Sequence, residues 1–134
     1  MNTETNYTVL LVEDDDVLMR MYQEKLESEG YVVFTAADGA EGLEMIKQHL
    51  PAVVLSDIMM PGTNGLQMLE QKRALEDARV RDIPVIMLTN LGSQEYHDKA
   101  VELGAVDLFD KEDPSVVVTK LREFLSPASS QPTE

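Results

Sequence analysis

Five short apolar runs, rich in β-branched residues, recur along the chain and set its overall pattern. They cover residues 7–12, 31–36, 52–56, 83–88 and 106–109. The first, third and fourth runs are almost continuously apolar, which is typical of strands that are buried on both faces of a sheet. The second and fifth runs are shorter or more mixed, so we expect them to form the edges of that sheet.

The segments between these runs carry apolar residues at helical spacing. Helices are expected over 16–29, from Asp38 to about Leu50, from Gly65 to Asp77, between Ser93 and Gly104, and from Asp113 to Leu125. Asp38, Ser93 and Asp113 suit the first positions of their helices, and Gly30 suits the stop after the first one. A strand followed by a helix, repeated five times, predicts an α/β fold in which helices cover both faces of a parallel sheet.

Length and composition are those of one globular domain: 134 residues, of which 43% are apolar. We expect this domain to span residues 6–125, with the polar residues 126–134 as a flexible tail or the start of a linker. The chain is then either a complete single-domain protein or the corresponding part of a longer protein.

Charge and targeting features exclude several classes of partner. The formal net charge of −14 disfavours direct binding to nucleic acid or to an anionic membrane surface. The sequence contains no signal-peptide pattern and no apolar run near the ~20 residues of a membrane span, so we expect a cytoplasmic protein. The absence of cysteine excludes disulfides and thiolate metal sites.

Chemically useful side chains follow the predicted strands. The first strand is followed by Glu13 and Asp14, the third ends in Asp57, the fourth in Thr89, and the fifth precedes Lys111. Ligands of open parallel sheets bind at the carboxyl ends of the strands, so these side chains are expected to meet. Each also has a plainer interpretation: a turn aspartate, a helix cap, a sheet threonine or a solvated lysine. One of the neighbouring residues 15 and 16 is expected to cap the first helix.

Together these residue types suit phosphoryl transfer. Carboxylates from two neighbouring strands are ligands that Mg²⁺ prefers, and a carboxylate can attack phosphorus to form an acyl phosphate. Lys111 would neutralise charge on the transferring group, and the Thr89 hydroxyl could donate to one of its oxygens.

Four blocks of the sequence carry a family resemblance: "LLVEDD", "SDIMMPGTNGLQML", "PVIMLTN" and "LFDKED". In their order and spacing they resemble the receiver domains of two-component response regulators (the CheY-like superfamily), over roughly residues 7–125. The resemblance implies a flavodoxin-like fold, a (βα)5 three-layer sandwich whose five strands lie in the order 2-1-3-4-5.

The resemblance also implies a role for each site residue. Asp57 would be the phosphoacceptor, Thr89 the switch hydroxyl and Lys111 the amine that contacts the phosphoryl group. Asp14 and Asp57 would bind Mg²⁺ (or Mn²⁺) directly, together with the backbone carbonyl of Met59, whereas Glu13 would act through water.

Partners follow from the same resemblance. A sensor histidine kinase or a histidine phosphotransfer protein would supply the phosphoryl group. A downstream protein would bind the face formed by the fourth helix, the fifth strand and the fifth helix. The chain would be a signalling switch rather than an enzyme, catalysing only its own phosphorylation and dephosphorylation.

The sequence departs from the family at several positions. Glu112 replaces the usual proline after the lysine, so we expect a trans peptide bond there. Leu108 replaces the usual switch Tyr or Phe, and Phe109 should face the other way. Met59 and Leu91 occupy positions that tune dephosphorylation, and neither side chain can hydrogen-bond an attacking water, which predicts a long-lived acyl phosphate.

Two other functions remain open. A pseudo-receiver would bind partners without being phosphorylated, and Leu108 and Glu112 keep that alternative alive. A haloacid-dehalogenase-type phosphatase also uses an aspartyl phosphate, but it needs a second aspartate where this chain has Met59.

Overall fold

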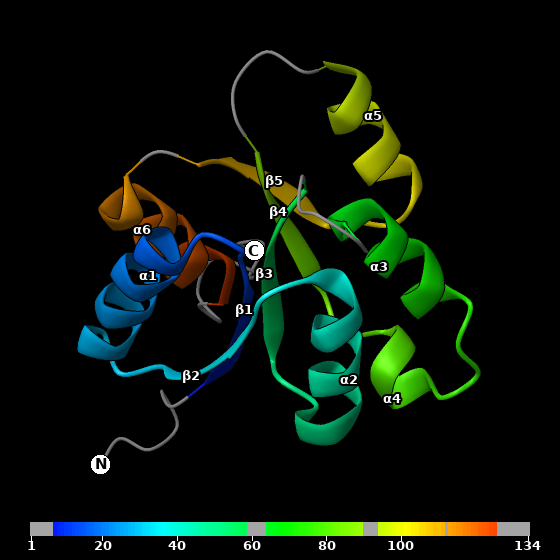
Figure 1. Ribbon diagram of the computed structural model, residues 1–134, viewed down its shortest axis with the longest axis horizontal. Helices are drawn as coiled ribbons and strands as arrows, with labels where there is room; N and C mark the ends of the chain where they lie inside the picture. The colour runs from blue at the N-terminus through cyan, green and yellow to red at the C-terminus, as the bar shows by residue number, and fades with distance from the viewer. Residues whose placement is uncertain (1–6, 59–63, 90–93, 112, 126–134) are drawn as a thin grey trace, which may run out of the picture.

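Strands and helices alternate along the chain as the apolar pattern predicts (Figure 1). The computed structural model describes residues 7–58, 64–89, 94–111 and 113–125. The strands are β1 (Thr8–Val12), β2 (Val32–Ala36), β3 (Val53–Asp57), β4 (Val85–Thr89) and β5 (Asp107–Asp110). The helices are α1 (Asp16–Ser28), α2 (Gly39–His49), α3 (Gly65–Arg73), α4 (Ala78–Arg81), α5 (Gln94–Glu102) and α6 (Pro114–Leu125).

The five strands form one parallel sheet in the order β2-β1-β3-β4-β5. This is the flavodoxin-like order, and the predicted fold class is confirmed. The chain runs from β1 to one side to form β2, then crosses to the other side to form β3. The carboxyl ends of β1 and β3 therefore flank the point where such sheets bind ligands.

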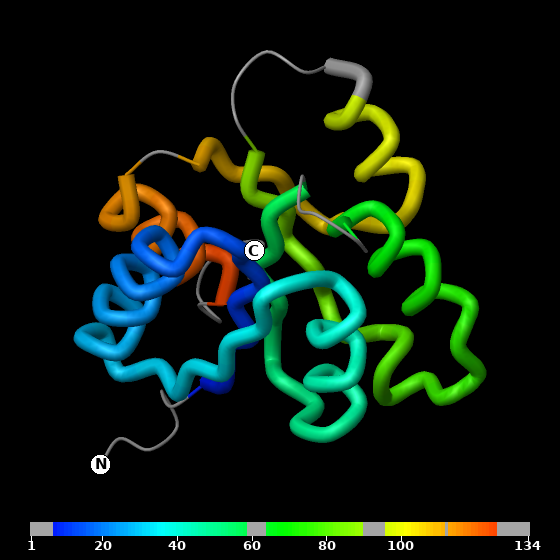
Figure 2. The backbone as a smooth tube through the Cα atoms, viewed as in Figure 1, coloured from blue at the N-terminus to red at the C-terminus, as the bar shows by residue number. Residues whose placement is uncertain are grey.

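Alternate residues of the inner strands feed two separate cores. Val9 and Leu11 of β1 face the core formed with α1 and α6, whereas Leu10 and Val12 face the core formed with α2 and α3. The tube drawing shows α1 and α6 side by side on one face of the sheet, with α2 and α3 on the other (Figure 2). Burial on both faces explains why the inner strands are continuously apolar.

The edge strands are also the predicted ones. All five residues of β3 are buried, whereas β2 at one edge begins with Val32, which is 45% exposed. At the other edge, Asp107 and Asp110 of β5 are exposed. The more mixed sequences of these two runs thus reflect their exposed positions.

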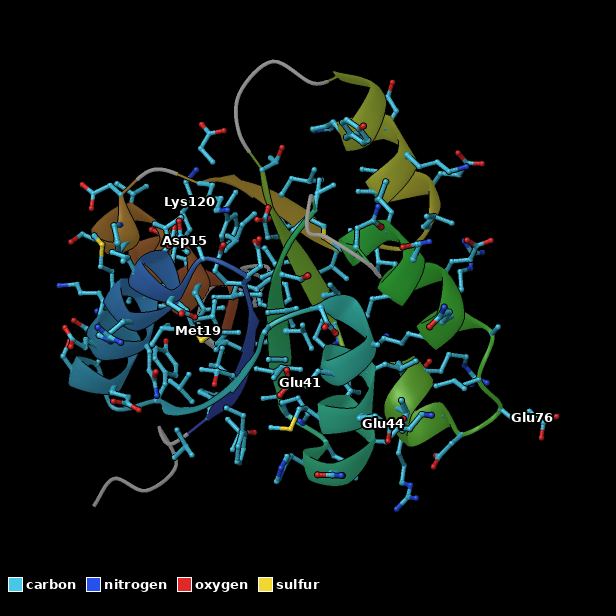
Figure 3. All side chains as sticks on the ribbon, in the orientation of Figure 1. Asp15, Met19, Glu41, Glu44, Glu76 and Lys120 are labelled. Atoms are coloured by element: carbon cyan, nitrogen blue, oxygen red, sulfur yellow. The ribbon has the colours of Figure 1, made fainter. Side chains whose placement is uncertain are left out.

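Aspartates begin three of the helices that the sequence predicts. The Asp15 carboxylate precedes α1 (Figure 3) and accepts hydrogen bonds from the backbone N–H groups of Val17 and Leu18. Asp38 caps α2 in the same way, and Asp113 accepts from the backbone N–H of Ser115 before α6. These contacts satisfy N–H groups that have no partner within the helix, and they confirm the expected caps. The expected cap at Ser93 lies outside the described residues.

The helix predicted from Gly65 to Asp77 is shorter than expected. It ends at Arg73, and a separate short helix, α4, begins after Asp77. The Asp77 carboxylate accepts a hydrogen bond from the backbone N–H of Arg79 at 3.0 Å and so starts the new helix instead of ending the old one. Because of this insertion, the fourth and fifth helices of the expected series are α5 and α6.

The last turn of α3 is fastened to both neighbouring helices. Lys72 is 5% exposed, and its ammonium donates to the carbonyl of Arg81 at the end of α4. Burial lowers the pKa of Lys72, although Asp82 acts in the opposite direction. Arg73 donates from Nη1 to the carbonyl of Glu102, the last residue of α5, at 3.0 Å.

Within the described ranges, no helix combines the length and the apolar character needed to cross a bilayer.

Candidate functional site

The predicted site residues meet at one end of the sheet. Glu13 directly follows β1, Asp57 ends β3, Thr89 ends β4 and Lys111 directly follows β5. These four strands are consecutive neighbours in the sheet. Because all of them are parallel, their carboxyl ends lie along the same edge.

A lysine links two of the carboxylates. The Nζ atom of Lys111 lies 2.6 Å from Oδ2 of Asp57 and donates a hydrogen bond to it. The same nitrogen lies 3.0 Å from Oε1 of Glu13 and donates to Oε2 at 3.3 Å. All three side chains are at most 10% exposed. One ammonium is thus shared by two almost buried acids.

This arrangement shifts the ionisation of both Glu13 and Lys111. Burial raises the pKa of Glu13, and the nearby ammonium offsets that effect only in part. Burial alone would lower the pKa of Lys111, but its hydrogen bonds to Asp57 and Glu13 outweigh burial and raise it. The ammonium is therefore firmly protonated, as a group that binds an anionic substrate must be.

A third carboxylate completes an acidic cluster. One oxygen from each of Glu13, Asp14 and Asp57 lies within 4.8 Å of the other two. Asp14 is exposed, so the cluster opens to solvent on that side. Three carboxylate oxygens beside solvent fit Mg²⁺, which binds through a few carboxylates and keeps several waters. The remaining expected ligand, the carbonyl of Met59, lies outside the described residues.

Thr89 is connected to the cluster through the backbone of Lys111. The N–H of Lys111 donates to the carbonyl of Thr89 at 2.8 Å. In the register of β3 and β4, Asp57 lies opposite Leu88, the residue before Thr89. The threonine therefore ends its strand one position beyond Asp57, beside the acids.

Two small residues behind Asp57 hold its backbone in place, and neither was among the predicted site residues. The buried Ser56 hydroxyl donates to the carbonyl of Asp57 at 3.0 Å. A Cβ atom at Gly65 would lie 2.4 Å from that same carbonyl oxygen. Only glycine allows α3 to begin this close to the end of β3. The "PGTNG" turn in the sequence indicates a tight connection, but the close approach depends on the tertiary fold.

The described residues include only some of the positions at which the sequence departs from the family pattern. Leu108 is half-buried against the core formed with α2 and α3, and Phe109 lies in the opposite core, as expected. An aliphatic side chain therefore occupies the position of the usual aromatic switch. Leu91 and Glu112 lie outside the described residues, so the trans peptide bond stays a prediction.

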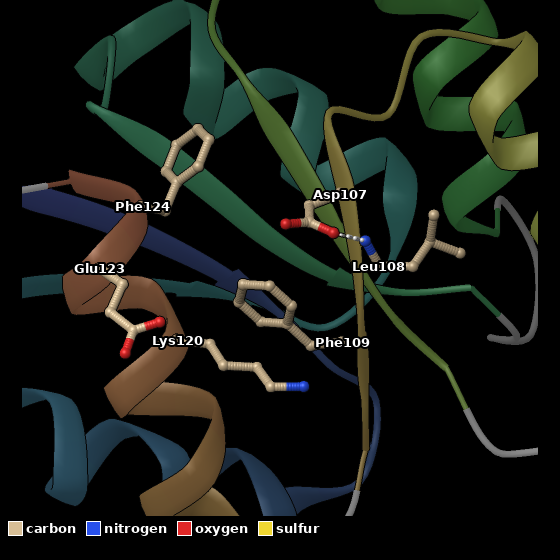
Figure 4. A pocket seen from close by; sticks show the side chains of 6 residues that line it. All are labelled: Asp107, Leu108, Phe109, Lys120, Glu123 and Phe124. Atoms are coloured by element: carbon tan, nitrogen blue, oxygen red, sulfur yellow. Dashed lines mark hydrogen bonds between the residues drawn. The ribbon is translucent and has the colours of Figure 1, made fainter. Parts of the chain in front are cut away.

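A separate hollow lies on the surface of β5 and α6 (Figure 4). Its lining residues are Asp107, Leu108, Phe109, Lys120, Glu123 and Phe124. Glu13, Asp14 and Asp57 do not line it, so it does not belong to the chemistry of the site.

Comparison with known proteins identifies the family. The model of the response regulator receiver domain matches residues 9–122. The chain belongs to the response regulator receiver family. The match lies inside the domain expected over 6–125, whose exact limits stay a prediction.

Relatives of this receiver domain are longer proteins. It is 35% identical over 126 residues to the probable transcriptional regulator ycf27 of Guillardia theta, covering 93% of this chain and 48% of that protein. It is 35% identical over 103 residues to the response regulator PleD of Caulobacter vibrioides, covering 77% of this chain and 22% of that protein. The receiver domain thus spans half or less of the length of these curated relatives.

Solved structures of similar size share the fold. The chemotaxis protein CheY4 of Vibrio cholerae superposes with a TM-score of 0.82 at 29% identity, covering 90% of this chain and 100% of that chain. A putative response regulator from Chloroflexus aurantiacus superposes with a TM-score of 0.81 at 30% identity, covering 90% and 98%. The receiver domain is therefore a component of two-component signalling.

Proposed function

We propose that this receiver domain accepts a phosphoryl group on Asp57 from a phosphohistidine of a sensor histidine kinase or a histidine phosphotransfer protein. The observation that carries the proposal is the shared ammonium of Lys111, which lies 2.6 Å from Asp57 and 3.0 Å from Glu13, with Asp14 completing the acidic cluster. The protein is then a cytoplasmic switch that catalyses only its own phosphorylation and dephosphorylation.

The chemistry is a simple exchange of bonds. A carboxylate oxygen of Asp57 forms a bond to phosphorus while the P–N bond to the donor's imidazole breaks, and the imidazole nitrogen keeps the electron pair. The Lys111 ammonium turns to the phosphoryl oxygens and donates hydrogen bonds to them, and the Thr89 hydroxyl donates to one of the same oxygens. Mg²⁺ held by Asp14 and Asp57, with Glu13 acting through water, would offset the remaining negative charge.

Phosphorylation is then read on the surface formed by α5, β5 and α6. Thr89 ends β4 and Lys111 follows β5, so contacts that these residues make with a phosphoryl group act directly on the segments leading into α5 and α6. The hollow on β5 and α6 gives a downstream protein a recess on that surface (Figure 4). The negative charge added at Asp57 thus changes the conformation of the surface formed by α5, β5 and α6.

Intact mass after incubation with Mg²⁺ and acetyl phosphate tests this proposal. We expect one added phosphoryl group on the wild type and on Asp107→Asn, whose exposed carboxylate on β5 is outside the acidic cluster. Asp57→Asn should remain unmodified. An unmodified wild type would overturn the proposal in favour of a pseudo-receiver, for which the aliphatic Leu108 is the specific argument. Repeated hydrolysis of phosphoesters would point instead to a phosphatase.

A further inference from the structure

Strands β1 and β3 stop pairing where the acidic cluster begins. Their last paired residues are Val12 and Ser56. The next residue of β1, Glu13, donates its N–H to the carbonyl of Ala36 on β2 at 3.0 Å. The carbonyl of Asp57 therefore lies beyond the paired part of β1 and β3, at the point where carboxylates from the ends of both strands gather.

A side-chain hydroxyl supplies a hydrogen-bond donor at this point. Ser56 is fully buried, and its hydroxyl donates to the carbonyl of Asp57 at 3.0 Å. Removing a donor from a buried carbonyl is unfavourable. The Ser56 hydroxyl therefore stabilises the orientation of the peptide unit that follows Asp57.

The first residue of α3 also confines this part of the backbone. A Cβ atom at Gly65 would lie 2.4 Å from the Asp57 carbonyl oxygen and 3.2 Å from the Ser56 hydroxyl oxygen. The N–H of Gly65 donates to the carbonyl of Ile58 at 2.9 Å. The successive carbonyls of Asp57 and Ile58 are thus each held by a hydrogen bond, the first from Ser56 and the second from Gly65.

The position of the Asp57 carboxylate depends on this backbone. Its Oδ2 lies 2.6 Å from Nζ of Lys111, and one of its oxygens lies within 4.8 Å of carboxylate oxygens of Glu13 and Asp14. An aspartate side chain has only two torsion angles, so a turn of the peptide unit beside its Cα also moves the carboxylate. Displacement of a functional group by about 1 Å is enough to impair it.

We propose that Ser56 is a positioning residue of the acidic cluster, whose hydroxyl fixes the Asp57 carbonyl and thereby holds the Asp57 carboxylate where it binds Mg²⁺ together with Asp14. This inference rests on the proposed function. Ser56 acts through the backbone of Asp57 and is not itself a ligand of the metal. Loss of its hydroxyl therefore weakens the binding of Mg²⁺, and a higher Mg²⁺ concentration compensates for the loss.

The first test is a titration of the unphosphorylated protein with MgCl₂, followed through the backbone amide resonance of Asp14. In Ser56→Ala the dissociation constant should rise about three- to tenfold, the effect of losing one hydrogen bond. Ser56→Thr keeps the hydroxyl and should bind Mg²⁺ within about twofold of the wild type, although its added methyl group crowds a buried position. Ile46→Val is the control for stability, because it trims a fully buried side chain of α2 and should leave the dissociation constant unchanged.

The second test separates positioning from general damage to the fold. With acetyl phosphate as donor, the phosphorylation rate of Ser56→Ala should fall at low Mg²⁺ and return to within about twofold of the wild type at saturating Mg²⁺. The carbonyl ¹³C resonance of Asp57 should move in Ser56→Ala and stay near its wild-type position in Ser56→Thr. A loss of rate that persists at saturating Mg²⁺, or an equal loss of Mg²⁺ affinity in Ile46→Val, would overturn the inference.

Failure of this inference can be told apart from failure of the proposed function. Equal Mg²⁺ affinity of the wild type and Ser56→Ala overturns the inference alone. A wild type that binds Mg²⁺ but is not phosphorylated overturns the proposed function, and the titration still decides the role of Ser56. A wild type that binds no Mg²⁺ overturns this inference together with the metal site of the proposed function.

Discussion

Lys111 and Lys72 are both nearly buried, yet their surroundings push their ionisation in opposite directions. Lys111 is placed between two carboxylates, and its pKa is raised. Lys72 donates to a backbone carbonyl, and burial lowers its pKa. The comparison shows that burial alone does not mark a functional lysine. A functional lysine is marked instead by buried carboxylates that contact its ammonium, as Glu13 and Asp57 contact Lys111.

The two lysines should therefore differ most in their effect on phosphorylation. Lys111→Met should reduce the rate of phosphorylation by acetyl phosphate by about 100-fold, the scale of losing one preorganised group that stabilises developing charge. Lys72→Met should leave the rate unchanged because α4 lies away from the site. Time courses of intact mass would measure both rates. Similar losses in both variants would mean that any buried lysine matters here only for folding.

Helix α3 begins beside the Asp57 carbonyl and carries Lys72 in its last turn, so it connects the surroundings of the two lysines. Its first residue, Gly65, provides the second test. Gly65→Ala should destabilise the protein by about 1–3 kcal/mol, since the new methyl group would overlap the Asp57 carbonyl. Denaturant unfolding would measure this change, and the phosphorylation rate should fall with it.

Gly42→Ala is the matched control. Its new methyl group would lie 3.0 Å from Sδ of Met68 and 3.1 Å from Cγ2 of Val12, both side-chain atoms, so it would crowd side chains and not the backbone. A gain of about 0.5–1 kcal/mol in helix stability should offset the remaining crowding. If the two variants were equally unstable, the contact with Asp57 would have no special weight.

The pH dependence of stability provides a smaller test. The lowered pKa of Lys72 means that, between its folded value and the ordinary 10.5, the unfolded chain binds more protons than the folded one. The Lys72 contribution therefore strengthens with rising pH across that window, by at most about 1.4 kcal/mol per pH unit, and is lost as pH falls through the folded pKa.

Urea unfolding at a series of alkaline pH values would show this slope as the difference between the wild type and Lys72→Met. Lys99→Met, at an exposed position of α5, should run parallel to the wild type. Lys111 has the opposite sign. Its raised pKa contributes stability that is complete below 10.5 and is lost only at higher pH. A Lys72 difference that fell with rising pH would contradict the lowered pKa.

The smallest expected effect concerns how long the phosphoryl group stays beside Lys111. Met59 and Leu91 cannot hydrogen-bond an attacking water, so the acyl phosphate should last for minutes or more in purified protein. Met59→Asn should shorten its half-life several-fold, and Lys72→Met should not change it. Loss of the phosphoryl group from the wild type within seconds would contradict this expectation.

The sequence indicates the fold and the principal acids because both follow local rules. Continuous apolar runs mark buried strands, and the residue that ends a parallel strand reaches the ligand-binding edge whatever the loops do. Glu13, Asp57 and Lys111 could therefore be brought together from their positions alone. The family blocks supplied the roles that geometry does not.

The features that escaped prediction all depend on tertiary contacts. Lysine is normally exposed, and nothing in the local pattern around Lys72 indicates that α4 folds over it. Asp77 could end one helix or begin another, and Leu75 continues the helical spacing of apolar residues. The sequence therefore does not show that α3 ends at Arg73. The need for glycine at position 65 arises from the Asp57 carbonyl, which the tertiary fold brings close to it.

Helix α3 works as a strut. Nine residues at 1.5 Å each make it about 13.5 Å long, and its first residue lies against the Asp57 carbonyl with no side chain between them. Its last turn grips α4 through Lys72 and α5 through Arg73. If α3 tilts at its first residue, its last turn is displaced as well. Crowding at the end of β3 and the position of the last turn of α5 are therefore linked through α3.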